Sequence, residues 1–212
     1  MSDNTPQMPE RVIKPRIPAS ARREMIVEAG LAEFAELGYE AASLGRIATA
    51  AGVARTVMYD HFPSKLALFQ TLLETEHREL LSYLEAALAS SGSTRDRWYA
   101  TFDAWFRFVE EQPLSWRLLY PARAPLETEA LEEHRRYRAW SNRVMAELLA
   151  ADARHAGLEP ETVRARALFA MHRDALAGGA RWWQNHPEAT RTELVDAAMA
   201  ALYTGFGGLQ PS

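Results

Sequence analysis

The chain has 212 residues, of which 48% are hydrophobic and 25% are charged, and this composition excludes a globally disordered protein. Cysteine is absent, so disulfides, thiolate metal sites and a cysteine nucleophile are excluded. No apolar run approaches the roughly 18 residues of a membrane span, and the N-terminus lacks the basic-then-apolar order of a secretory signal. We therefore expect a soluble, cytoplasmic protein made of one domain, or of a small module fused to a larger one.

The net charge of -4 argues mildly against nucleic-acid binding, because lysine and arginine supply the affinity for phosphates. The distribution of charge weakens this argument, since residues 1–69 are neutral overall and the acidic excess lies in the remainder. A basic stretch without any acidic residue lies near the N-terminus and contains Arg11, Lys14, Arg16, Arg22 and Arg23.

Proline and glycine divide the first third of the chain into short segments. Four of the eleven prolines fall within residues 1–18, which we expect to form an extended basic arm. A helix is predicted over residues 19–37 and ends at Gly38. Ser43 is placed to cap a second, short helix, Gly52 separates it from a third that ends near residue 59, and Ser64 is placed to cap a long fourth helix.

The remaining segments are also helical in pattern. A polar break at residues 90–94 precedes a helix with an aromatic face, and a short apolar piece follows at residues 114–120. Pro125 and Pro160 are placed to open helices that run to about residues 155 and 185. A capping box in the last helix, which we expect to end near residue 205, pairs Thr190 with Glu193. Because no segment shows the period-2 alternation of a strand, the fold class is predicted to be all-α, with nine helices.

Two short helices that meet at Gly52 form the most informative motif. Small and apolar side chains at Ile47, Ala51, Val53 and Met58 provide a compact core between them. This pattern is typical of a helix-turn-helix, whose second helix lies in the DNA major groove. The alternative is a helical hairpin inside a bundle. Polar groups just beyond the motif favour DNA, since they suit phosphate oxygens; they belong to Tyr59, His61 and Lys65.

The N-terminal region resembles the tetracycline-repressor-like (TetR) family of bacterial transcriptional regulators. The matching positions are Arg23, Ile26, Ala29, Phe34, Gly38-Tyr39, Ser43-Leu44, Ile47-Ala48, Ala51-Gly52-Val53, Tyr59, His61-Phe62, Lys65 and Leu68-Phe69. The resemblance implies an arm over residues 1–18, a DNA-binding domain over residues 19–65, and an effector-binding and dimerisation domain over residues 66–212. The chain departs from the family pattern at Gly30, Gly45 and Asp60.

Individual DNA contacts can be assigned from side-chain chemistry. Arg55 is the best candidate to read a guanine, and Thr56 and Val57 can contact thymine methyl groups. Ser43 and Thr49 are expected at phosphates, together with the three polar residues beyond the motif. The basic arm either enters the minor groove or is a solvated tail. Asp60 either points away from the DNA or accepts from a cytosine, and Gly45 either approaches a phosphate or weakens its helix.

The C-terminal part is expected to contain a cavity for a small, largely apolar effector. Polar residues on apolar helix faces, together with aromatic neighbours, are typical of such sites in bundles, although each taken alone is more often part of the core. The candidate effector contacts are His77, Phe102, Phe106, Tyr137, Ser141, Phe169 and His172.

Catalysis, a cofactor and a bound metal are not expected. The triplet His172-Arg173-Asp174 mimics a kinase catalytic loop, but Gly179 stands where that loop needs asparagine. No two histidines are spaced four residues apart for a metal.

The resemblance, with small residues enriched in the last two helices, implies a homodimer. We therefore expect a ligand-responsive regulator, most readily a repressor, that binds inverted-repeat double-stranded DNA and does not associate with membranes. The alternative is a small-molecule-binding helical protein with a degenerate DNA-binding head.

Overall fold

The computed structural model describes residues 17–89, 92–155 and 157–203. These residues form ten α-helices and a final turn of π-helix, and no strand occurs among them, which confirms the all-α prediction. The expected basic arm lies outside the described residues except at its last two positions, and so does the expected end of the last helix near residue 205.

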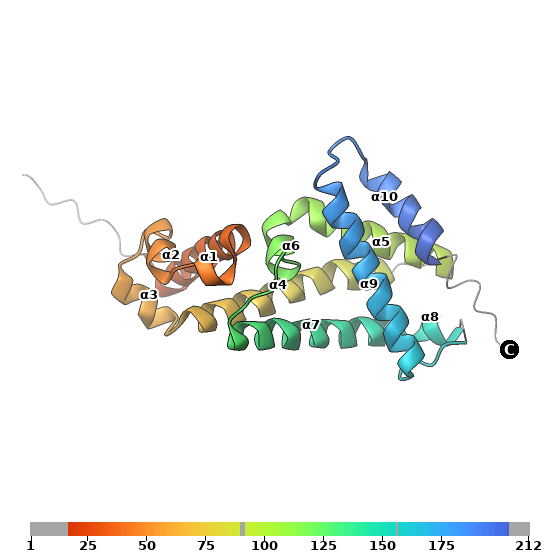
Figure 1. Ribbon diagram of the computed structural model, residues 1–212, viewed down its shortest axis with the longest axis horizontal. Coiled ribbons are helices and arrows are strands. Elements are labelled where there is room, and N and C mark those ends of the chain that lie inside the picture. Colours follow the sequence, from red (N-terminus) through yellow and green to blue (C-terminus); the bar gives the residue numbers. More distant parts are fainter. Residues whose placement is uncertain (1–16, 90–91, 156, 204–212) are drawn as a thin grey trace, which may run out of the picture.

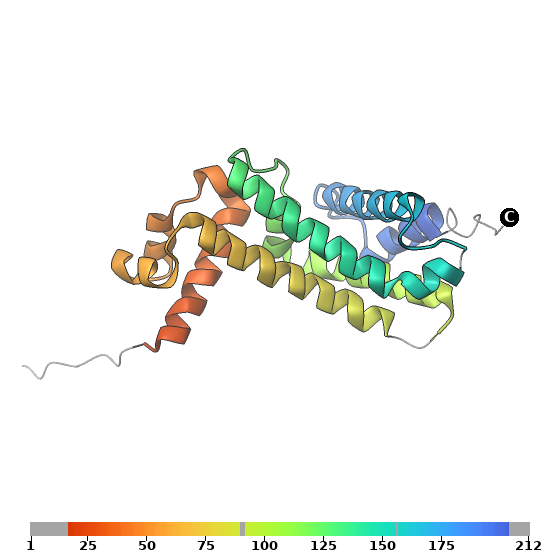
Figure 2. The same ribbon diagram turned by 90° about the horizontal axis from the view of Figure 1, so that it is seen from below.

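The molecule is elongated, with a small head at one end and a larger helical body at the other (Figure 1). The head contains α1 (Ala19–Ala41), α2 (Leu44–Ala50) and α3 (Arg55–His61). The body contains α4 (Lys65–Leu88), α5 (Thr94–Glu111), α6 (Pro113–Leu119), α7 (Thr128–Leu148), α8 (Ala150–His155), α9 (Val163–Trp183), α10 (Arg191–Ala198) and the π-helix Met199–Tyr203. The view in Figure 2 shows α4 and α7 running side by side along the long axis, and the two helices are in contact.

Local capping chemistry sets several helix starts where the sequence predicts them. The hydroxyl of Ser64 accepts from the backbone N–H of Ala67 at 3.0 Å. The capping box of Thr190 and Glu193 forms at the start of α10, with each side chain satisfying a backbone N–H of the other residue. The first helix differs from the prediction, because it resumes after a kink at Gly38 (φ 77°) and ends at Ala41.

Two proline-based helix starts were predicted too early. Instead of beginning at Pro125, α7 begins at Thr128, and it ends at Leu148, where a break separates it from α8. The hydroxyl of Thr162, rather than Pro160, marks the start of α9 by accepting from the N–H of Ala165. At α9 the accepting hydroxyl satisfies a free N–H at the helix start, which proline cannot do, whereas α7 begins without a side-chain cap.

One continuous apolar core joins the head to the body. Phe34, Phe69 and Tyr39 form an aromatic cluster with ring centroids 4.9 to 5.9 Å apart. Gly30 explains the close crossing of α1 and α4, because a Cβ there would lie only 3.0 Å from the side chain of Leu68. The departure at Gly30 therefore has a packing reason.

The interface of α4 with α6 and α7 contains buried polar side chains. His77 is fully buried and stacks on Tyr137, and neither of its ring nitrogens has a hydrogen-bond partner among the described residues. Burial, with the nearby His134 and Arg138, lowers the pKa of His77 to about 3. Burial also lowers the pKa of His134, whose Nε2 lies 3.1 Å from the carbonyl oxygen of Leu119.

We expect His77 to make folding less favourable in mild acid. The unfolded chain gains a proton on this residue below its ordinary pKa of about 6.5, whereas the folded chain stays neutral down to about 3. Stability that is present above pH 6.5 is therefore lost as the pH falls, by about 2 kcal/mol between pH 7 and pH 5. The free energy of unfolding can be measured with urea at pH 7 and at pH 5. The decrease between the two pH values should be smaller in His77→Leu than in the wild-type protein by about 2 kcal/mol. An equal loss in both proteins would contradict the assignment.

Candidate functional site

The turn between α2 and α3 has the geometry of a helix-turn-helix. Gly52 adopts φ 64°, a conformation that favours glycine, and the N–H of Val53 closes the turn on the carbonyl of Ala48 at 3.0 Å. Ile47 and Met58 are fully buried between the two helices. A compact core of this kind fixes the angle between α2 and α3.

The start of α2 is braced against α1. Ser43 caps α2 as predicted, its hydroxyl accepting from the N–H of Arg46 at 3.3 Å. The carboxylate of Glu33 on α1 accepts from the N–H of Ser43 at 3.1 Å and from Nε of Arg46 at 2.7 Å. A Cβ at Gly45 would meet only the hydroxyl of Ser43, at 3.6 Å, so this position has room on the protein side.

One face of α3 is open to solvent and carries most of the predicted base contacts. Arg55, Thr56, Tyr59 and Asp60 are exposed on it, while the neighbouring Val57 and His61 are half-buried. The guanidinium of Arg55 lies 5.9 Å from the ring centroid of Tyr59. Asp60 shares this exposed face, so it does not turn into the head. The DNA contacts themselves stay predictions.

Lys65 occupies a contact between helices. Its ammonium donates to the carbonyl of Tyr39 at 2.8 Å, lies 4.1 Å from the centroid of the Tyr39 ring, and pairs with Glu127 at 3.4 Å. The predicted phosphate contact of Lys65 stays a prediction, and the structure gives this residue a second role in holding the start of α4 against its neighbours.

The head is also tied to α7 through Glu40 at the end of α1. Its carboxylate accepts from the backbone N–H of Leu126 at 2.5 Å and from that of Glu127 at 3.2 Å. Burial alone would raise the pKa of Glu40, but these hydrogen bonds lower it. An acidic side chain from the head thus binds two backbone N–H groups immediately before α7, near a helix start where negative charge is favoured.

A cavity of about 890 Å³ lies in the body between α4, α5, α7 and α9. Its walls combine aromatic and aliphatic side chains with a set of charged residues. The lining includes Leu80, Leu84, Trp98, Thr101, Phe102, Trp105, Tyr120, Ser141, Asn142, Arg143, Met145, Glu147, Leu149, Arg154, Glu161, Arg166, Phe169, His172, Arg173 and Leu176. Burial raises the pKa of Tyr120, which keeps its hydroxyl neutral.

Four of the seven predicted effector residues line this cavity: Phe102, Ser141, Phe169 and His172. The other three do not. His77 and Tyr137 stack on each other between α4 and α7. Phe106 packs against α9, where its ring centroid lies 6.0 Å from that of Trp183. For His77 and Tyr137 the reason is helical phase, because an apolar stripe on a helix is wide enough to face two neighbours.

The charged part of the lining was missed at the sequence level. On α9, Arg166, Phe169, Arg173 and Leu176 are three or four residues apart and lie on one face toward the cavity. This spacing is visible in the sequence, but arginines on a helix face usually lie in solvent, so the spacing alone did not indicate a cavity.

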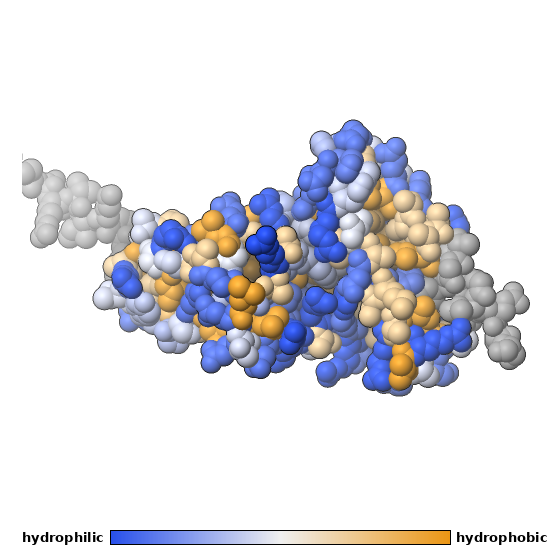
Figure 3. Space-filling model, viewed as in Figure 1, coloured by the Kyte–Doolittle hydropathy of each residue, from blue (hydrophilic) through white to orange (hydrophobic). Residues whose placement is uncertain are grey.

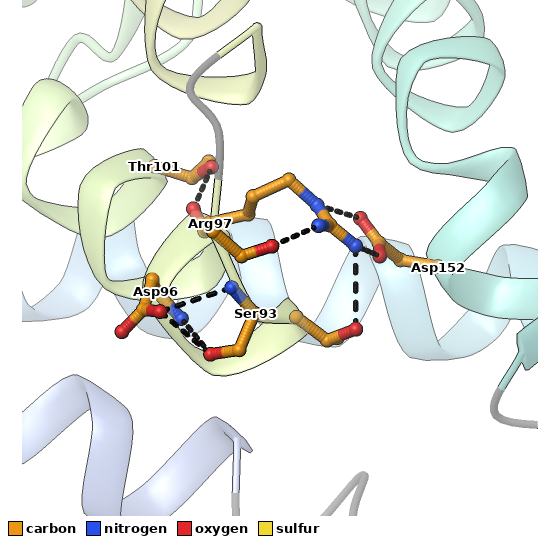
Figure 4. Close-up of polar contacts among 7 residues, drawn as sticks. Ser93, Asp96, Arg97, Thr101 and Asp152 are labelled. Atoms are coloured by element: carbon orange, nitrogen blue, oxygen red, sulfur yellow. Dashed lines mark hydrogen bonds and ion pairs between the residues drawn. The ribbon is translucent and has the colours of Figure 1, made fainter.

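A polar clasp joins α5 to α8 (Figure 4). The guanidinium of Arg97 on α5 binds both carboxylate oxygens of the buried Asp152 on α8. Arg97 also donates to the carbonyl of Gly92 at 2.9 Å and to the hydroxyl of Thr94 at 3.2 Å. The contact therefore joins two helices that both contribute to the cavity wall.

The outward face of α9 carries exposed apolar and small side chains, together with the exposed Arg164 seven residues before Met171. Val163, Met171 and Trp182 are exposed there, along with the small residues Ala167 and Ala175. The space-filling view in Figure 3 shows hydrophobic residues gathered over α9 and beside α10. Not all the small residues of these helices belong to this face, since Ala165, Ala177, Ala180 and Ala198 are buried within the chain.

Among the described residues, no helix combines the length and the apolar character that crossing a membrane requires.

Comparison with known proteins gives concordant matches. The family model for bacterial regulatory proteins of the tetR family matches residues 26–72. The HTH-type transcriptional activator FasR of Mycolicibacterium smegmatis is 30% identical over 196 residues, which are 92% of this chain and 85% of that protein.

Solved structures share the fold. The fatty acid degradation regulator FadR from Bacillus halodurans superimposes with a TM-score of 0.73 at 19% identity, covering 94% of this chain and 100% of that chain. FadR from Bacillus subtilis, solved in complex with stearoyl-CoA, gives a TM-score of 0.68 at 15% identity, covering 85% and 95%. The fold, the matched head and the match to FasR along most of its length lead to one conclusion: the chain belongs to the tetR family of bacterial regulatory proteins.

Proposed function

We propose that this protein is a ligand-responsive transcriptional regulator that binds an inverted-repeat operator as a homodimer. The observation that carries the proposal is the combination, in one chain, of an exposed recognition helix and a cavity of about 890 Å³, joined by the continuous helices α4 and α7. The match to FasR, which is named a transcriptional activator, supports regulation of transcription.

DNA reading is assigned to the exposed face of α3. Arg55 at its start is placed to bind guanine O6 and N7, and Thr56 and Val57 to contact thymine methyl groups. Ser43, Tyr59, His61 and Lys65 are assigned to the phosphates on either side; these contacts set the register of the head without reading sequence.

Coupling between cavity and head is assigned to the starts of α4 and α7. Leu80 and Leu84 of α4 line the cavity, while Lys65 at the other end of the same helix contacts Tyr39 and Glu127. A ligand that moves either helix therefore changes the position of the head. Two heads must enter successive major grooves about 34–36 Å apart, and coupling energies of about 1–3 kcal/mol are typical of such systems.

The effector is assigned a largely apolar body. Trp98, Phe102 and Trp105 form one wall of the cavity, and the Bacillus subtilis FadR structure was solved with stearoyl-CoA. A ligand that separates the heads would relieve repression, whereas the name of FasR favours activation. A promoter-reporter assay with and without the protein distinguishes the two directions.

The second candidate is a small-molecule-binding protein with a degenerate head. It is favoured by Asp60, which places a carboxylate on the exposed face of α3, and by the net charge of -4. DNA phosphates repel both the carboxylate of Asp60 and a chain of net negative charge.

Selection of bound duplexes from random DNA at a stated salt concentration should enrich an inverted repeat. The spacing between the half-sites should correspond to about one helical turn, because two symmetric heads bind symmetric sites. Failure of folded, dimeric protein to enrich any sequence would favour the second candidate.

Substitution Arg55→Ala should relax the base preference at one position of each half-site and weaken specific binding by about 1–3 kcal/mol. Repeating the duplex selection with the variant measures both effects. Arg78→Ala is the matched control, because Arg78 is exposed far along α4 and pairs with Glu74. Unchanged sequence preference in Arg55→Ala would assign base reading to another residue.

Substitution Met171→Glu should convert the dimer to a monomer. The side chain is 65% exposed at the centre of the apolar face of α9, and burying an unpaired carboxylate in an interface is unfavourable. Sedimentation velocity measures the mass, and Leu126→Glu, at an exposed residue before α7, serves as control. A dimeric Met171→Glu protein would place the interface elsewhere.

A further inference from the structure

The inner face of α9 presents a guanidinium to the cavity. Arg173 lies on the same helix face as Phe169 and Leu176, and all three line the cavity. The side chain of Arg173 is only 15% exposed. It acts electrostatically on Tyr120, another residue of the lining, where it opposes the raising of the pKa by burial.

The ion pair of Arg173 leaves much of its charge uncompensated. Its Nε and one terminal nitrogen contact a single carboxylate oxygen of Asp174, at 2.9 and 2.8 Å. The side chain of Asp174 is 62% exposed, and ion pairs with a solvated partner contribute little. A guanidinium has five donors in a fork that matches carboxylate and phosphate geometry.

The charged residues of the lining, Arg173 included, are basic on balance. Four arginines (Arg143, Arg154, Arg166 and Arg173) line the cavity against the two glutamates Glu147 and Glu161. The arginines come from α7, α8 and α9, whereas the walls from α4 and α5 are apolar and aromatic. Arg143, Arg154 and Arg166 are exposed, so Arg173 is the one arginine of this lining that is largely shielded from solvent. The cavity thus combines apolar walls from α4 and α5 with one half-buried guanidinium on α9.

We propose that the cavity binds an amphipathic anion, with its apolar part against Trp98, Phe102 and Trp105 and its anionic group on Arg173. This inference deepens the proposed function, because it names the class of the effector. The anionic group is either a carboxylate on the ligand itself or a phosphate on its carrier, and both are recognised by the same fork of N–H donors.

A matched set of probes tests the charge requirement on the full-length protein without DNA. Dodecanoate, dodecanol and dodecanoyl-CoA share one apolar chain and differ in their head group. Binding below the micelle concentration can be followed by tryptophan fluorescence, because two of the six tryptophans, Trp98 and Trp105, line the cavity. Wild-type protein should bind at least one of the two anionic probes about tenfold or more tightly than the alcohol.

Arg173→Gln should abolish this preference and leave the affinity for dodecanol unchanged, because the apolar wall is intact. Arg181→Gln is the matched control, since Arg181 is an exposed residue of the same helix that does not line the cavity. Arg173→Lys keeps the charge without the planar fork, so it should retain part of the preference; this second variant also covers a failure of Arg173→Gln to fold.

The preferred anionic probe identifies the source of the charge, a free carboxylate or a phosphate of the carrier. The proposal is overturned if wild-type protein binds the alcohol as tightly as both anions or binds none of the three. It is also overturned if the preference survives unchanged in Arg173→Gln. Because no DNA is present, these results do not depend on whether the chain selects an operator.

Discussion

The continuity of α4 is the constraint on which the rest of this structure depends. The helix runs without a break from Lys65 to Leu88. Its first turns contribute Leu68 and Phe69 to the core around α1, and its later turns contribute Leu80 and Leu84 to the cavity wall. A rigid rod buried at both ends cannot adjust at one end alone, because protein interiors are close-packed.

Polar contacts around the start of α7 also connect the head to the body. Glu40 binds two backbone N–H groups there, and Lys65 pairs with Glu127 beside them. These contacts are few, polar and partly exposed, so each contributes modestly. These polar contacts supplement the continuous apolar core, which itself joins the head to the body.

Features that depend on local chemistry were predictable from the sequence. Ser43, Ser64 and the pair Thr190 and Glu193 cap helices as expected, because the hydrogen bonds involved span only three residues. The helix-turn-helix was equally accessible, since the positive φ of Gly52 and the small core around it lie within one short segment. The all-α class followed from periodicity alone.

Features that depend on helix phase or on distant partners were not predictable. His77 carries the same signal as His172, a polar residue on an apolar stripe, yet only His172 lines the cavity. Which side of the stripe faces which neighbour is decided by packing between helices far apart in the sequence. Likewise, Arg97 and Asp152 are 55 residues apart, and nothing local in either helix marks them as partners.

The two faces of α9 have a consequence for how subunits would sense one another. A single helix, roughly 10 Å thick, separates the cavity lining on one side from the exposed apolar face with Met171 on the other. In the proposed dimer this wall belongs to both compartments, so a ligand that shifts it in one subunit also alters the surface offered to the second. Ligand binding in one subunit would then change the ligand affinity of the other subunit. The response to ligand would be cooperative, to a degree set by the rigidity of α9.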